Sequence, residues 1–178
     1  MDIVALGTLI GLSLTVFVAP LLWFLPQSDA RANRFLALFV LIAGLSLLQT
    51  FLLHSGLVFR YPGLSSLGLS SLGKSCYFAL GPLLYFYTKA QSDRRFVFLS
   101  RDAWHFLPVL ISFAAYLPVY FASPAVKLQA QKLYFSGTAT TAPDGWGGLE
   151  ELAMFLTIHL IQYIVLMLHL AVYAVLTL

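Results

Sequence analysis

The side chains best suited to chemistry lie in the last apolar stretch of the 178-residue sequence. Five of them carry polar groups: His159, Gln162, Tyr163, His169 and Tyr173. All but Tyr163 follow one another at offsets of 3, 7 and 4 residues, and such offsets bring side chains to one face of a helix. The sequence therefore predicts a polar stripe along one side of an apolar helix.

Three kinds of chemistry could use this stripe. Polar groups at membrane depth are costly in lipid, so we expect the stripe to face other helices or a wet cavity. There it would form interhelical hydrogen bonds or line a pocket that senses a ligand or a proton. A shared metal ion does not fit, because His159 and His169 are ten residues apart, about 15 Å along a helix axis. The metal-binding patterns HxxxH and HExxH do not occur in the sequence.

No catalytic set can be assembled from the sequence. It has no GxSxG nucleophile elbow. Its single cysteine, Cys76, can form neither an intramolecular disulfide nor a thiolate cluster. The seven acidic residues lie in polar breaks or at the termini, so they form no intramembrane carboxylate pair for an ion-coupled pump. We therefore expect no enzyme, no metal site and no cofactor.

The composition excludes a water-soluble domain. Hydrophobic residues make up 60% of the chain and charged residues only 10%, with a mean hydropathy of +0.88, whereas about a quarter of an ordinary globular chain is charged. The net charge of +3 comes from bases scattered among the polar breaks. We interpret these basic residues as setting the orientation of the helices in the membrane, and not as a surface that binds nucleic acid. We expect lipid to cover most of the surface.

Five apolar stretches are long enough to cross a membrane as helices. A hydrocarbon core of about 30 Å needs about 20 helical residues, and runs this continuous do not alternate like barrel strands. The stretches cover residues 3–25, 35–59, 67–88, 104–121 and 152–178, and an outer loop covers 122–151. The sequence predicts one domain over residues 1–178, an all-α bundle of five transmembrane helices. Because the last stretch is still apolar where it stops, we expect a truncated larger bundle.

The basic residues predict the orientation of the bundle. Six lie in short breaks on one side: Arg31, Arg34, Lys89, Arg94, Arg95 and Arg101. Four lie on the other side: Arg60, Lys74, Lys127 and Lys132. Because basic residues favour the cytoplasmic side of a membrane, we expect the N-terminus outside and the C-terminus in the cytoplasm.

Glycine and proline mark places where helices approach or bend. Gly7 and Gly11 form a GxxxG pair, which allows close contact with another helix. Gly81 and Pro82 lie inside the third stretch and Pro118 near the end of the fourth. Proline removes a backbone hydrogen bond and bends a helix. At Gly81 and Pro82 the bend is either a moving hinge or a fixed kink, and the sequence leaves both open.

Three motifs resemble a known family. They read NRFLAL over residues 33–38, YFALGPLLYFY over 77–87 and HFLP over 105–108. Together they are similar to the multi-span N-terminal region of membrane-bound AraC-type bacterial transcriptional regulators, and the likeness covers residues 33–178. The resemblance implies a protein of the bacterial cytoplasmic membrane with a larger bundle, followed by a cytoplasmic helix-turn-helix domain that reads DNA. The present sequence contains the bundle without that domain.

The expected function follows from the topology and the resemblance together. We expect a membrane-embedded sensor or anchor domain that relays a signal to the DNA-binding domain absent from this chain. The alternative is a small membrane transporter or transporter subunit, which the polar stripe and the prolines within helices would also fit. The expected partners are the lipid bilayer, a small-molecule or peptide signal, DNA through the missing domain only, and a second copy of the chain in a homodimer.

Overall fold

The computed structural model describes residues 3–25, 30–61, 75–93, 95–121 and 149–177, without the side chains of residues 118, 119, 149–160, 162 and 163. Within these residues every regular element is helical, so the all-α prediction is confirmed for this part of the chain. The elements in chain order are α1 (Ile3–Phe24), α2 (Ala30–His54), α3 (Leu57–Arg60), η1 (Tyr77–Ala79), α6 (Leu80–Ser92), η2 (Ser100–Phe106), α7 (Leu107–Ala115), α8 (Leu117–Phe121) and α10 (Leu149–Thr177).

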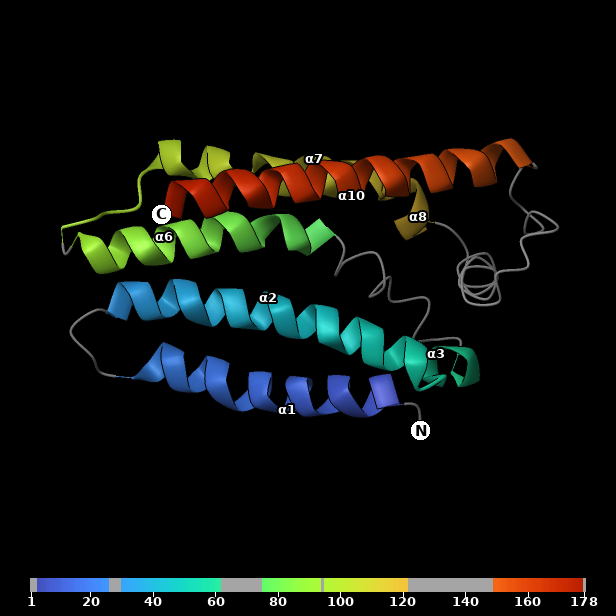
Figure 1. Cartoon of the computed structure of the whole chain (residues 1–178), viewed down its shortest axis with the longest axis horizontal. Helices are drawn as coiled ribbons and strands as arrows, with labels where there is room; N and C mark the ends of the chain where they lie inside the picture. Colours follow the sequence, from blue (N-terminus) through green and yellow to red (C-terminus); the bar gives the residue numbers. More distant parts are fainter. Residues whose placement is uncertain (1–2, 26–29, 62–74, 94, 122–148, 178) are drawn as a thin grey trace.

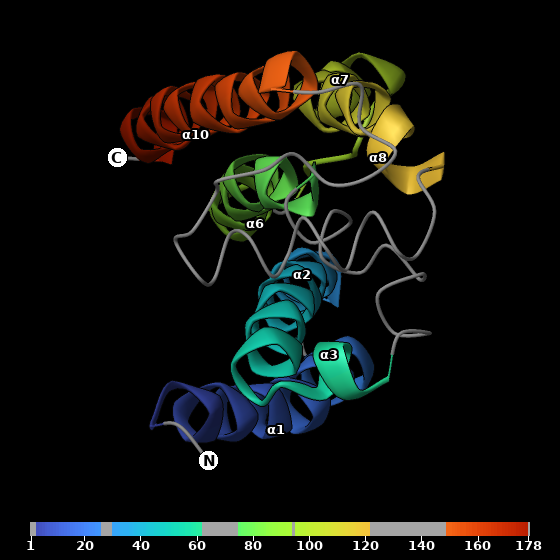
Figure 2. The ribbon, with the colours of Figure 1, turned by 90° about the vertical axis from the view of Figure 1, so that its right-hand side faces the viewer.

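The long helices lie side by side and alternate in direction (Figure 1). α1 packs on α2, α2 packs on α6, and α6 packs on α10. Viewed along the helices, α6 lies between α2 on one side and α7 with α10 on the other (Figure 2). The start of α2, the end of α6, the start of η2 and the end of α10 all lie at the same end of the bundle.

Two helices among the described residues, α1 and α2, are long and apolar enough to cross a membrane. They contain 22 and 25 residues, and a helix rises about 1.5 Å per residue. α1 agrees with the predicted stretch 3–25 to within one residue. α2 starts and ends five residues before the predicted stretch 35–59.

Small side chains bring α1 close to α2. The buried residues of α1 lie on one face: Ala5, Thr8, Thr15 and Ala19. At Gly44 of α2, an added Cβ atom would lie 2.2 Å from the Cγ2 atom of Thr15. No residue larger than glycine therefore fits at position 44 without moving one of the two helices.

The GxxxG prediction holds for one glycine of the pair. Gly11 faces α2, because a Cβ atom there would lie 2.9 Å from the Cδ1 atom of Leu47. A Cβ atom on Gly7 would meet no atom within 4 Å. The prediction was wrong for Gly7, because this residue lies off the buried face that carries Thr8 and Thr15.

A glycine ends the second helix earlier than its apolar run suggests. Gly56 has a φ angle of 73°, in the left-handed region that glycine adopts readily and that stops an α-helix. α2 accordingly ends at His54, and α3 follows as a separate short helix.

A proline divides the fourth predicted span, 104–121. The span begins in η2, continues as α7 to Ala115, turns at Tyr116 and ends in α8. Pro118 has no N–H to donate to the carbonyl of residue 114, so the α-helical bonding pattern cannot continue through this point. The kink expected at Pro118 is thus a short break in the helix.

The remaining spans are described only in part. Of the third predicted span, 67–88, residues 67–74 lie outside the described part, and η1 leads directly into α6, which extends to Ser92. The fifth predicted span, 152–178, forms α10, which begins three residues earlier, at Leu149. Of the predicted outer loop, only the residues that open α10 belong to the described part.

Candidate functional site

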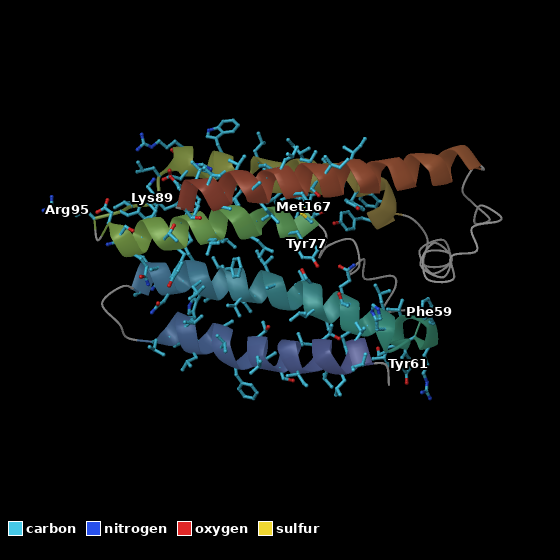
Figure 3. The ribbon with its side chains drawn as sticks, viewed as in Figure 1. Phe59, Tyr61, Tyr77, Lys89, Arg95 and Met167 are labelled. Carbon is cyan, nitrogen blue, oxygen red and sulfur yellow. The ribbon has the colours of Figure 1, made fainter. Side chains whose placement is uncertain are left out.

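Basic residues gather at one end of the bundle, which we call the basic end. The structure places five of the six predicted topology-setting residues there, in the first turns of α2 and η2 and around the end of α6: Arg31, Arg34, Lys89, Arg95 and Arg101. Figure 3 shows Lys89 and Arg95 at this end, and Phe59 and Tyr61 at the opposite end. Arg94 lies outside the described residues.

An aromatic core closes the basic end. Phe86 of α6 is fully buried, and its ring stacks on Phe96 and Phe106 with centroid distances of 6.1 and 6.0 Å. The Nη1 atom of Arg31 donates to the carbonyl of Phe96, and the Nζ atom of Lys89 lies 4.8 Å from the centre of the Phe96 ring. These contacts fix the segment between α6 and η2 against the start of α2.

Next to this core, a histidine and a tyrosine join η2 to α10. The Nδ1 atom of His105 lies 2.5 Å from the hydroxyl oxygen of Tyr173, and the ring of Tyr85 is 5.5 Å from His105 and 6.0 Å from Tyr173 between centroids. Gly81 of α6 makes room for this arrangement, because a Cβ atom there would lie 2.7 Å from Cδ2 of Tyr173. The phenol is therefore held by its hydroxyl group and by its ring.

A second histidine binds the backbone where α6 begins. Pro82, which is fully buried, has no N–H to donate to the carbonyl four residues earlier, that of Phe78. The Nε2 atom of His169 lies 3.0 Å from this carbonyl oxygen. A carbonyl has no hydrogen to give, so His169 donates the hydrogen bond that proline cannot make. His169 of the predicted polar stripe thus bonds to the backbone beside Pro82, where the sequence predicts a bend.

A hollow of about 480 Å³ opens beside these two histidines. It lies between η2 and α7 on one side and α10 on the other. Most of its lining is apolar, with polar groups from two imidazoles, one phenol and one indole. The lining residues are Trp104, His105, Pro108, Val165, Leu168, His169, Val172 and Tyr173.

The structure brings together part of the predicted site. His169 and Tyr173 meet the predicted bend at Gly81 and Pro82, whereas the side chains of His159, Gln162 and Tyr163 lie outside the described part. Among the side chains that are described, no three His, Cys, Asp or Glu residues lie close enough to hold a metal ion.

His105 is the site residue that the sequence analysis missed, because it lies in a different predicted span from the polar stripe. The useful signal was the alternation of helix directions. It places the start of the fourth span and the end of the fifth at the same end of the bundle (Figure 1). His105 and Tyr173 lie in these two segments and bond to each other.

One sequence pattern points to a different chemistry. Residues 68–75 read GLSSLGKS, which matches the GxxxxGK[ST] phosphate loop, although the apolar repeat around it obscures the match. Residues 68–74 lie outside the described part. The hydroxyl of Ser75, the position that would hold Mg²⁺ in such a loop, is buried and accepts a hydrogen bond from Ser112 at 3.1 Å. Ser75 therefore joins the segment before η1 to α7, and its hydroxyl bonds within the bundle.

No family model matches the chain, and no curated protein or solved structure is similar to it. The function must therefore be argued from the contacts described above and from the resemblance carried by the three sequence motifs.

Proposed function

We propose that the chain is a membrane-embedded sensor module that relays a signal to the cytoplasmic helix-turn-helix domain of a transcriptional regulator. The observation that carries the proposal is the hydrogen bond from His169 to the carbonyl of Phe78, which Pro82 leaves without its helical donor. This bond joins η1, which leads into α6, to α10, the helix that runs to the basic end. A signal that strengthens or weakens it changes how α10 is presented at that end.

Exposed apolar side chains support insertion of α1 and α2 into a membrane. Only 11% of the most apolar window of α1 is buried, whereas a core helix of a water-soluble protein buries most of its length. Ile10, Phe17 and Phe24 are 55%, 75% and 79% exposed. Apolar surface left in water costs roughly 25 cal/mol per Å², and lipid contact removes that cost.

The other helices are proposed to cross the membrane beside α1 and α2. α10 has 29 residues, and its outer side chains Ile164, Met167 and Val175 are 53%, 64% and 71% exposed. The alternation of direction along α1, α2, α6, α7 and α10 (Figure 1) fits five consecutive crossings. Successive crossings alternate in direction, because each one returns the chain to the opposite side of the membrane, and they are helical because each backbone must bond within its own segment.

The basic end is proposed to face the cytoplasm of a bacterial cell. Five described basic residues lie at that end, and basic residues near the ends of spans favour the cytoplasmic side. The end of α10 lies there too. In this orientation the N-terminus is outside, and a change in α10 reaches the side of the membrane where DNA is found.

The role in transcription is proposed from the family resemblance. Its two most specific motifs, GPLLY over residues 81–85 and HFLP over 105–108, meet in space. The Tyr85 and His105 rings are 5.5 Å apart, and Gly81 receives the Tyr173 ring. The motifs that carry the resemblance also build the candidate site, which supports a shared function for both.

Cysteine labelling in intact cells tests the orientation. In the full-length gene product with Cys76→Ala, the variants Ala30→Cys and Asp93→Cys should resist an impermeant maleimide, because both positions lie at the basic end. Ser55→Cys, at the opposite end of α2, should react and serves as the matched control. Labelling at positions 30 and 93 but not at 55 would invert the proposed topology.

Chromatin immunoprecipitation of the full-length gene product tests the regulatory role. A tag at the N-terminus should recover specific promoter DNA, and His169→Phe should change transcription from those promoters at equal membrane abundance. Recovery of no specific DNA would contradict the role in transcription, whatever the labelling shows about topology.

A further inference from the structure

The hollow beside α10 has the features of a site for a small molecule that arrives through lipid. Its volume of about 480 Å³ falls within the range of roughly 300–1,000 Å³ that is usual for small-molecule pockets. The side chains of Trp104, Leu168 and Val172 on its rim are 71%, 64% and 56% exposed. The hollow therefore opens on the side of the bundle, which faces acyl chains in the proposed topology on which this inference rests.

Two imidazoles in the hollow each use one ring nitrogen within the bundle. The Nε2 atom of His169 faces the carbonyl of Phe78 and carries the hydrogen. Its Nδ1 atom is then an acceptor in the neutral ring. The Nδ1 atom of His105 faces the hydroxyl of Tyr173. When the hydroxyl donates to that atom, the Nε2 atom of His105 carries the hydrogen and is a donor. With the two rings in these tautomers, the remaining ring nitrogens of the lining histidines are one donor and one acceptor.

We propose that the hollow binds a single-chain amphiphile with an uncharged carboxamide head group. The carbonyl of the amide accepts from Nε2 of His105, and its N–H donates to Nδ1 of His169, so both ring nitrogens are satisfied. The apolar side chains of α7 and α10 contact the alkyl chain. A phosphate or carboxylate head group matches less well, because it has only acceptors to set against the acceptor nitrogen of His169.

Occupancy of this site acts on the bend of α6. The ring of His169 contacts the head group on one side and the carbonyl of Phe78 on the other. A ligand that fixes the ring favours the packing in which α6 is tied to α10, and it shifts the equilibrium by as much as its affinities for the two packings differ. The site thereby supplies the signal for the proposed sensor.

Tryptophan quenching tests this site directly. The full chain is placed in lipid nanodiscs with Trp23→Phe and Trp146→Phe, which leaves Trp104 on the rim as the one remaining tryptophan of three. The probe is 11-bromoundecanamide, whose bromine quenches a nearby indole. We expect saturable quenching by this amide, and quenching that rises linearly with concentration for 1-bromoundecane, which has no head group.

Two leucines provide a matched pair of variants. Leu168 lines the hollow and Leu110 does not, yet their side chains are 64% and 65% exposed. Leu168→Phe fills the hollow and should weaken amide binding at least about fivefold, whereas Leu110→Phe should leave it unchanged. His105→Phe removes the donor and should weaken binding about tenfold, with quenching by 1-bromoundecane unchanged.

Linear quenching by the amide would overturn the proposal, because it would mean that ordinary acyl chains occupy the hollow. An equal loss in Leu168→Phe and Leu110→Phe would also overturn it. Either result leaves the topology and the DNA association standing, since both are measured in cells. Saturable binding by a protein that recovers no specific DNA would contradict the proposed function and leave the binding site standing.

Discussion

The α1 and α2 pair and the elements around α10 are held by different kinds of contact. On one side α1 meets α2 through small residues, and the hydroxyls of Thr8 and Thr15 donate to carbonyls of their own helix. On the other side, hydrogen bonds run between elements: His105 bonds to Tyr173, and His169 bonds to the backbone of η1. Close packing joins α1 to α2, whereas in the other half hydrogen bonds between elements add to the aromatic core around Phe86.

This difference separates a fixed part from an adjustable part. Closely interdigitated atoms have no second arrangement of similar energy, because protein interiors are packed like crystals. A hydrogen bond contributes only about 0.5–1.5 kcal/mol net, so a bond to a ligand can replace it. We therefore expect the α1 and α2 pair to anchor the protein, and the contacts among α6, η2 and α10 to change with the signal.

The strongest test of the comparison is to separate the packed helices. Gly44→Leu places side-chain atoms where Thr15 already lies, and we expect a loss of about 3 kcal/mol in the free energy of unfolding. Thermal unfolding followed by fluorescence-detected size exclusion would measure it. Gly7→Leu is the control, because a Cβ atom there meets nothing within 4 Å. Equal losses in both variants would remove close packing as the basis of the anchor.

A smaller effect is expected at the bonded half. His169→Phe leaves the carbonyl of Phe78 without its donor, and an unsatisfied buried carbonyl should cost about 2 kcal/mol. Pro82→Ala restores an N–H that can reach this carbonyl, so His169→Phe should cost less than half as much in that background. A double-mutant cycle on the unfolding free energy isolates this coupling. Additive costs would show that His169 does not replace the missing backbone donor.

The smallest effect is expected from removing single hydroxyl groups, one in each half of the molecule. Tyr173→Phe removes a bond between elements and should cost about 1 kcal/mol. Thr15→Val removes a bond within one helix, whose carbonyl keeps its backbone partner, and should cost under about 0.5 kcal/mol. Both are read in the same unfolding assay. Equal costs would erase the distinction between the two halves.

The apolar runs predicted the long helices well, because a minimum length of continuous apolar chain is what a bilayer requires. α1 ends within one residue of its predicted limit. The same criterion could not predict the break at Gly56, since hydropathy measures solubility and not which backbone carbonyls find a donor. The break at Pro118 could be predicted, because the sequence shows that proline has no N–H to donate.

For the candidate site, the sequence predicted which residues share one face of the last predicted helix, but not which residues they contact. Helical spacing placed His169 and Tyr173 on one side of a helix, but their partners lie 91 and 68 residues away along the chain. Such pairs depend on which helices become neighbours, and a single sequence does not specify that. The sequence did single out Pro82 as a break in backbone hydrogen bonding, without indicating that a side chain from α10 bonds to the carbonyl left over.

The hydrogen bond from His169 to Phe78 can form only after α10 has been synthesised. The carbonyl of Phe78 is synthesised 91 residues before the imidazole that satisfies it. In the proposed membrane topology it faces acyl chains until then, where an unbonded peptide group costs several kcal/mol. We therefore expect a nascent chain that contains α6 but not α10 to remain at the insertion machinery, because the carbonyl of Phe78 still lacks its donor. The arrival of α10 satisfies this carbonyl, and we expect chains interrupted before residue 149 to be retained or degraded.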